Sequence, residues 1–250
     1  MIDSHCHLND PKLLIDLAGV IERARVAGVE SFIVPGYDLV SSETAVSIAS
    51  TNEGVYALVG IHPHDAITYS KEVENRLEEL LGYDKVVGLG EIGLDYHYDN
   101  SPREKQREVF IRQLELAKKV GKPVVIHSRE AFLETFELIR DHGKGLKGVF
   151  HCFSGSYESA MRVIKELGFY ISIAGPVTFK NAKEPLEVAA RIPLEYLLIE
   201  TDCPYLAPHP FRGKQNEPAY LPYIAERISE VRGLDIIEAT VLNTKRLFGL

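Results

Sequence analysis

The sequence predicts an α/β protein that folds as a (β/α)8 barrel, also called a TIM barrel. Short β-branched runs alternate with longer amphipathic segments along the whole chain, which is typical of βαβ units and a parallel sheet. There are eight such runs, and reactive side chains follow most of them, as expected for a barrel whose site lies at the carboxyl ends of its strands. An open doubly wound sheet is the alternative, and the count of eight and the placement of polar residues favour the barrel.

The eight predicted strands are apolar runs of four to six residues. Their ranges are Ile2–His7, Ser31–Pro35, Tyr56–Ile61, Val86–Glu91, Val124–His127, Gly148–His151, Tyr170–Ile173 and Tyr196–Glu200. No linker interrupts their alternation with helical segments, so we expect one domain over residues 1–250.

The segments between these runs have the apolar spacing of helices. The stretches "LLIDLAGVIERARVAG", "PREKQREVFIRQLELAKKVG" and "SYESAMRVIKELG" each end in a glycine of the kind that follows a helix. Ser101 and Pro102 are the expected N-cap and first residue of the second stretch. Two further helical segments, "LPYIAERISEVRG" and "IIEATVLNTKRLFG", complete the chain.

Composition and charge narrow the class of protein. The 250 residues are 45% hydrophobic and 26% charged, an ordinary globular composition. The chain has no apolar run near the ~18 residues of a membrane span, and its start lacks the features of a signal peptide, so we expect a cytoplasmic protein without membrane contact. The net charge of −8 argues against a basic coat for nucleic acid but allows a nucleic-acid enzyme that uses metals and a local basic rim.

Histidines mark the predicted strand ends. The opening stretch "MIDSHCHLND" places His5 and His7 on one side of a strand, which fits either two structural histidines or half of a metal site. His127 and His151 also follow apolar runs. Seven of the nine histidines lie at or just beyond a predicted strand end, and histidines scattered at random would not share one end of a barrel. This distribution favours metal ligands.

Carboxylates complete the candidate site. Glu91 ends the run "VVGLGE", where an isolated carboxylate is costly to bury unless it is paired or bound to a metal. Asp202 lies nearer the mouth than Glu200 and is the better ligand or base, so we expect Glu200 to support a ligand.

Other polar residues have weaker signals. His62 and His64 flank Pro63, where a role in substrate binding or in supporting the site and a simple loop role are both open. The three cysteines, Cys6, Cys152 and Cys203, each follow a proposed ligand, so strand alternation turns them toward the helices as packing groups. Such a sparse, odd set does not form a disulfide framework.

Seven motifs together resemble the TatD family of metal-dependent deoxyribonucleases, within the amidohydrolase-like barrels. In chain order they are "DSHCHL", "GIHPH", "GEIGLDYH", "VVIHSR", "FHCFSG", "ETDCPYLAP" and "RGKQNEP". The resemblance covers nearly the whole chain and implies a hydrolase with a two-metal site. Ser4 stands where the family often has Thr, and Gln215 stands where Arg is common, which removes one cation from the substrate rim.

The resemblance also implies roles for individual residues. One divalent ion would be held by His5, His7 and Asp202, and a second by His127 and His151, with Glu91 bridging the two. The ions would be Zn, Mn or Mg, since imidazole favours the transition metals whereas family nucleases often use Mg or Mn. Asp202 and Glu91 would be catalytic. Residues expected to bind substrate are His62, His64, Arg129, Arg212 and Lys214.

The expected reaction is cleavage of DNA phosphodiester bonds by an activated water, acting on single strands or ends and perhaps 3′ to 5′. A related amidohydrolase acting on an amide, lactone or phosphotriester is the alternative. Many barrels of that kind bridge their metals with a modified lysine on the fourth strand, and Glu91 in this position favours the nuclease. A non-catalytic binding barrel is the third hypothesis, which a complete ligand set disfavours.

Overall fold

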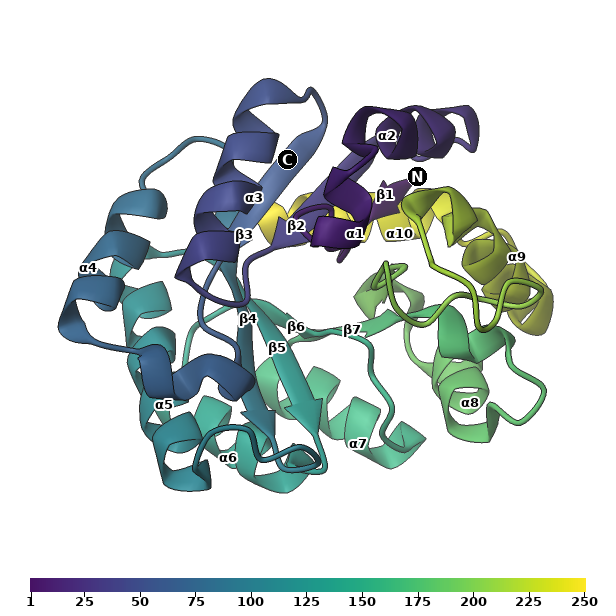
Figure 1. Ribbon diagram of the computed structural model, residues 1–250. Helices are drawn as coiled ribbons and strands as arrows, with labels where there is room; N and C mark the ends of the chain where they lie inside the picture. The colour runs from purple at the N-terminus through teal and green to yellow at the C-terminus, as the bar shows by residue number, and fades with distance from the viewer.

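A computed structural model describes residues 1–250, and it contains the predicted barrel. Eight parallel strands follow one another in sheet order from β1 to β8, with helices packed around them (Figure 1). The strands are β1 (Ile2–Asp3), β2 (Ser31–Pro35), β3 (Val55–Val59), β4 (Val86–Asp95), β5 (Val124–Arg129), β6 (Gly148–Phe150), β7 (Tyr170–Ile173) and β8 (Leu197–Ile199). The segment after β1 closes the ring by hydrogen bonds to the end of β8 and to the residues that follow it, including Ser4 N to Ile199 O at 3.2 Å and Asp202 N to His5 O at 3.0 Å.

The α-helices occupy the predicted segments between and after the strands. They are α1 (Pro11–Leu14), α2 (Leu17–Val26), α3 (Leu39–Thr51), α4 (Lys71–Leu80), α5 (Arg103–Val120), α6 (Phe132–His142), α7 (Tyr157–Arg162), α8 (Lys183–Arg191), α9 (Leu221–Arg232) and α10 (Ile237–Phe248). The predicted stop at Gly121 is confirmed, because Gly121 adopts the left-handed conformation (φ 70°) that ends α5. No helix has both the length and the apolar character needed to cross a membrane.

The helix α5 begins one residue later than predicted. Pro102 is its N-cap and Arg103 its first residue, so Ser101 does not cap it. Instead the Ser101 hydroxyl donates to the carbonyl of His64 at 2.7 Å and accepts from Ile67 N at 3.2 Å. Ser101 therefore anchors the loop that carries His64.

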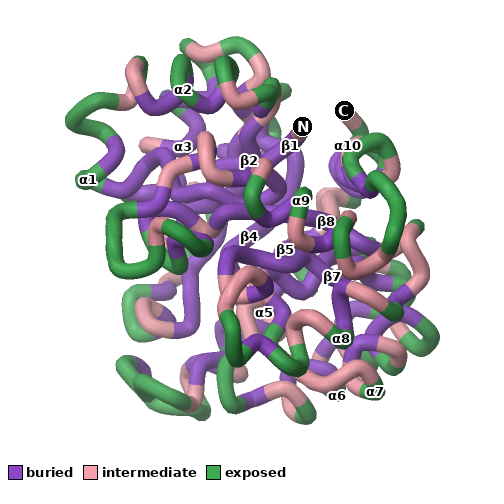
Figure 2. The backbone as a smooth tube through the Cα atoms, turned by 90° about the vertical axis from the view of Figure 1, so that its right-hand side faces the viewer, coloured by how far each residue is buried: buried purple, intermediate pink, exposed green.

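Two apolar clusters hold the barrel together. The larger one has 56 buried residues and lies between the strands and the helices, and it includes Cys6 and Cys203 as predicted. The smaller cluster takes one residue from each strand and two from the end of α10, namely Ile2, Ile33, Leu58, Val87, Val125, Val149, Tyr170, Leu198, Leu247 and Phe248. The strands are mostly buried, whereas the helices show exposed outer faces (Figure 2). The amino end of the barrel is thus closed by α10.

Strand alternation places polar residues on the same side as this inner cluster. His127 follows Val125 by two residues, and His151 follows Val149 in the same way, so both face the interior one step nearer the carboxyl end. The predicted extent of the first strand, Ile2–His7, was wrong. Ile2 faces the interior, and in a regular strand His5, three residues further on, would face the opposite side. The strand ends at Asp3, and an irregular segment then turns both His5 and His7 inward.

Cys152 departs from the prediction made for the cysteines. It is half-buried with φ 42°, and it is not part of either apolar cluster. Burial raises the pKa of its thiol well above the ordinary value, and the carboxylates of Asp202 and Glu200 raise it further. The left-handed turn after β6 breaks the strand alternation on which the prediction depended.

Candidate metal centre

The candidate site is a cavity of 640 Å³ at the carboxyl ends of the strands. Eight of the residues proposed from the sequence line it, namely His7, His62, His64, Glu91, His127, Arg129, His151 and Asp202. His5 lies fully buried beneath them. Arg212 and Lys214 do not line the cavity, and Arg212 lies instead 4.5 Å above the ring of Phe179.

Glu91 is the centre of the site. Its Oε1 lies 2.8 Å from His127 Nδ1 and 2.8 Å from His151 Nε2, and its Oε2 lies 3.4 Å from His5 Nε2. Burial alone would raise the pKa of Glu91, but the charge of His151 and hydrogen bonds from His127 and His151 hold that pKa well below its usual range. The carboxylate is therefore ionised, and it faces imidazoles from four parts of the chain.

Two buried carboxylates orient two of these histidines. His127 Nε2 lies 2.9 Å from Asp95 Oδ2, and His151 Nδ1 lies 3.3 Å from Glu200 Oε1. When the outer nitrogen of an imidazole donates to a carboxylate, the inner nitrogen is left with its lone pair free for a metal. Glu200, which the sequence predicts to support a ligand, contacts the candidate ligand His151 and is completely buried.

His5, His7 and Asp202 form a second group beside Glu91. Asp202 Oδ1 lies 3.7 Å from His5 Nε2 and 3.5 Å from His7 Nε2, and the two Nε2 atoms are 3.2 Å apart. Asp202 has φ 55°, a left-handed conformation that aspartate tolerates better than most residues. This turn after β8 directs the carboxylate back across the barrel toward the segment after β1.

His62 and His64 lie on the loop after β3, where η1 (Pro63–Thr68) begins. His62 Nδ1 accepts a hydrogen bond from His64 N at 3.1 Å, so in the neutral ring the proton is on Nε2, which lies 3.4 Å from Glu91 Oε1. Burial lowers the pKa of His62 to about 4, which keeps the ring neutral. This arrangement directs His62 Nε2 toward Glu91.

The donor set fits divalent cations. Three groups of residues could each hold a metal ion, because the possible ligand atoms within each group lie within 4.8 Å of one another. The groups are His5 with His7 and Glu91, His5 with His151 and Asp202, and His62 with Glu91 and His127. The Nδ1 atoms of His5 and His7 have no hydrogen-bond partner, while their Nε2 atoms face each other. The cavity is lined by five carboxylates, from Asp10, Asp65, Glu91, Asp95 and Asp202, against one cation, Arg129. Imidazole and carboxylate together suit zinc and other transition metals.

Several residues of the cavity were not predicted from the sequence. Asp95 belongs to the motif "GEIGLDYH". The predicted strand ended at Glu91, whereas β4 continues to Asp95. A register shift between Leu89 and Ile92 hides this continuation from a simple strand pattern. Three tyrosines also line the cavity, Tyr37, Tyr98 and Tyr205, and they come from loops that carry no strand signal.

Comparison with known proteins agrees with this geometry. The model of the family described as TatD related DNase matches residues 2–249. The chain belongs to this family. One relative of the chain is a Bacillus subtilis protein named "uncharacterized metal-dependent hydrolase YabD". It is 46% identical over 99% of this chain and 98% of its own length.

Another TatD-family relative is the Escherichia fergusonii protein named "3'-5' ssDNA/RNA exonuclease TatD", which is 36% identical over 100% of this chain and 99% of its own. Among solved structures, the TatD homologue YJJV from Escherichia coli K12 superposes with a TM-score of 0.94 at 32% identity, covering 100% of this chain and 98% of that one. The chain is therefore a TatD-family metal-dependent hydrolase with the TIM-barrel fold predicted from its sequence.

Proposed function

We propose that this TatD-family hydrolase cleaves phosphodiester bonds in single-stranded DNA, releasing nucleotides from the 3′ end. The observation that carries the proposal is the convergence of His5, His127 and His151 on Glu91 at the base of an open cavity. The exonuclease name of the Escherichia fergusonii relative supports the direction of cleavage. Residues 1–250 would act as one domain.

Two divalent ions would be held by the predicted ligands. His5, His7 and Asp202 would hold one ion, His127 and His151 the other, and Glu91 both. Zn, Mn and Mg are the candidate metals. Such ions would activate a water molecule and stabilise charge on the phosphate.

The protein's own groups would move the proton and fix the ligands. An Asp202 carboxylate oxygen, at the cavity wall, would accept the proton of the attacking water. Burial raises the pKa of Asp202, but a hydrogen bond from His7 and the charge of His151 lower it more, so the carboxylate is ionised and able to act as a base. Asp95 and Glu200 would hold His127 and His151 in the productive orientation.

The cavity walls suit an unpaired strand. Tyr98 and Tyr205 expose about half of their surface, at 55% and 49%, and Arg129 lies 4.8 Å above the ring of Tyr98. Exposed aromatic rings bind unstacked bases and guanidinium groups bind phosphates, and a base is available for stacking only in a single strand. Arg129 would contact phosphate, and His64 would contact the substrate at the rim. Arg212 and Lys214 would contact DNA only beyond the cavity.

The deciding experiment is a digest of 5′-end-labelled single-stranded DNA with Mn²⁺, Mg²⁺ or Zn²⁺. We expect a ladder that shortens one nucleotide at a time and stops on addition of EDTA, and a slower reaction on blunt duplex. Release of the label as a mononucleotide before the strand has shortened would contradict 3′-to-5′ removal. Absence of cleavage with every metal would refute the nuclease and favour an amide, lactone or phosphotriester substrate.

A further inference from the structure

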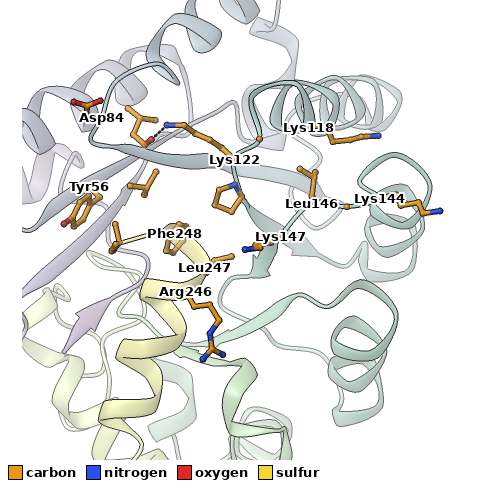
Figure 3. A pocket seen from close by; sticks show the side chains of 17 residues that line it. Tyr56, Asp84, Lys118, Lys122, Lys144, Leu146, Lys147, Arg246, Leu247 and Phe248 are labelled. Carbon is orange, nitrogen blue, oxygen red and sulfur yellow. Dashed lines mark hydrogen bonds between the residues drawn. The ribbon is translucent and has the colours of Figure 1, made fainter.

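A second cavity lies at the opposite end of the barrel from the metal centre. Its volume is 830 Å³, and it is bordered by residues that precede β4, β5 and β6 and by the end of α10. Five cationic side chains line it, from Lys118, Lys122, Lys144, Lys147 and Arg246, against one acidic side chain, Asp84 (Figure 3). We call this cavity the basal pocket.

The five cations of the basal pocket form no ion pair. Elsewhere on the molecule arginines are held by carboxylates, as Arg103 is by Asp99 at 2.7 Å and Arg112 by Glu74 at 2.9 Å. The negative ends of α5 and α10 account for Lys118 and Arg246, which lie in the last turns of those helices. Lys144 directly follows Gly143, the C-cap of α6, so a helix end accounts for it as well. No helix end accounts for Lys147, which directly precedes β6. Unpaired like charges repel one another and do not stabilise a fold, so their gathering on an acidic protein indicates an anionic ligand.

The floor of the basal pocket is apolar and partly aromatic. Leu247 and Phe248, at the end of α10, are almost completely buried against the inner apolar cluster, and Tyr56 forms another wall. In Figure 3, Lys147 points toward the end of α10 that carries Leu247 and Phe248, whereas Arg246, an exposed side chain of the same helix, extends away from them. A pocket of this volume is within the range of about 300–1,000 Å³ that holds small organic ligands, and is far larger than an inorganic anion needs.

We propose that the basal pocket binds a nucleoside phosphate. The base would lie on the apolar floor formed by Leu247, Phe248 and Tyr56, and the phosphate would contact Lys147 and Arg246. Arginine binds phosphate as a two-pronged donor and lysine as a point charge, so the two residues are complementary. Lys122 is already held by the carbonyl of Val86 and contributes mainly its charge.

Photo-crosslinking tests both the ligand and its location on the full, metal-loaded chain. The probe is 8-azidoadenosine 5′-monophosphate, with peptide mapping of the labelled sites. We expect label on the peptides that contain Tyr56 or residues 246–250, competed by excess dAMP but not by equal concentrations of deoxyadenosine or inorganic phosphate. Peptide mapping distinguishes label at the metal centre from label at the basal pocket. The outcome for the basal pocket therefore does not depend on whether the nuclease assay succeeds.

The matched variants are Lys147→Glu with Arg246→Glu and, as control, Lys165→Glu with Lys183→Glu, two exposed lysines that do not line the basal pocket. We expect the first pair to reduce labelling of the basal pocket by about tenfold or more, the effect of losing one charge-assisted hydrogen bond, and the control pair to leave it unchanged. Circular dichroism confirms that each variant is folded. Absence of label at the basal pocket, an equal loss in both pairs, or full competition by inorganic phosphate would overturn the proposal.

Discussion

At the scale of single residues, Glu91 contacts both groups of candidate ligands, with Oε1 toward His127 and His151 and Oε2 toward His5. Glu91→Gln keeps the shape of the side chain but removes its charge and half of its acceptor capacity. We expect bound metal to fall at both positions and turnover to fall by more than the ~10–100-fold typical of residues that only support a ligand. Elemental analysis and the DNA digest measure the two effects.

The control for this substitution is Glu115→Gln, at an exposed carboxylate of α5 with no ion pair. It should retain full metal content and activity. Full metal occupancy in Glu91→Gln would show that Glu91 does not hold both ions.

Tyr98 and Tyr205 provide a second test at this scale. Stacking of a base on an aromatic ring is worth about 1–3 kcal/mol, so Tyr98→Ala or Tyr205→Ala should raise KM for single-stranded DNA about 5- to 150-fold with a smaller change in kcat. Tyr83→Ala, at a tyrosine of similar exposure that does not line the cavity, is the control. An unchanged KM in both cavity variants would contradict base stacking at the mouth.

The residues most accessible to sequence analysis were those that end an apolar run. His127, His151 and Glu91 were predicted because a polar side chain after β-branched residues must be satisfied in the interior. Asp95 and the tyrosines were missed because their contacts are made by β4 beyond a register shift and by loops, and neither leaves a periodic pattern. Arg212 and Lys214 were expected to contact phosphate as cations of a shaped loop, but the loop after β8 carries them away from the cavity, where Arg212 lies over Phe179 and Lys214 over Phe211.

At the scale of elements, the short strand β1 shows where alternation fails as a guide. A regular strand over Ile2–His7 cannot turn both Ile2 and His5 inward, since they are three residues apart. The chain resolves this conflict by ending the strand at Asp3 and pairing the next residues with the segment after β8. The strand's existence was therefore predictable, but its end depended on contacts with residues almost 200 positions away.

Asp3 joins these two segments. Its Oδ2 accepts from Thr201 Oγ1 at 2.6 Å and its Oδ1 from Thr201 N at 3.0 Å, and all of these atoms are buried. Asp3→Ala leaves two buried donors without acceptors, which should lower the free energy of unfolding by about 1–3 kcal/mol or more. Because Thr201 precedes Asp202, metal content should fall as well.

Urea denaturation of Asp3→Ala measures the loss of stability. The control Glu115→Ala is expected to change the free energy of unfolding by less than about 0.5 kcal/mol. Stability equal to that of the control would show that other contacts close the barrel.

At the scale of the whole molecule, charge is distributed unevenly between the two ends of the barrel. The metal centre is lined by five carboxylates and one arginine, whereas the basal pocket is lined by five cations and one aspartate. The net charge is −8. Phosphate groups would therefore be repelled from the mouth unless cations occupy it, so the metals are needed for substrate binding as well as for chemistry.

This charge distribution predicts that DNA binding itself depends on divalent metal. A single-stranded phosphorothioate oligonucleotide that resists cleavage should bind in Mn²⁺ and lose at least about tenfold in affinity when EDTA is added, as measured by fluorescence anisotropy. The salt dependence should be shallow, because few lysines or arginines outside the cavity neutralise phosphates, and each such contact adds about 0.7 to the slope for a single strand. The Lys165→Glu and Lys183→Glu variant should bind like the unmodified protein. Equal affinity with and without metal, or a steep salt slope, would indicate that DNA binds to a basic surface elsewhere on the molecule.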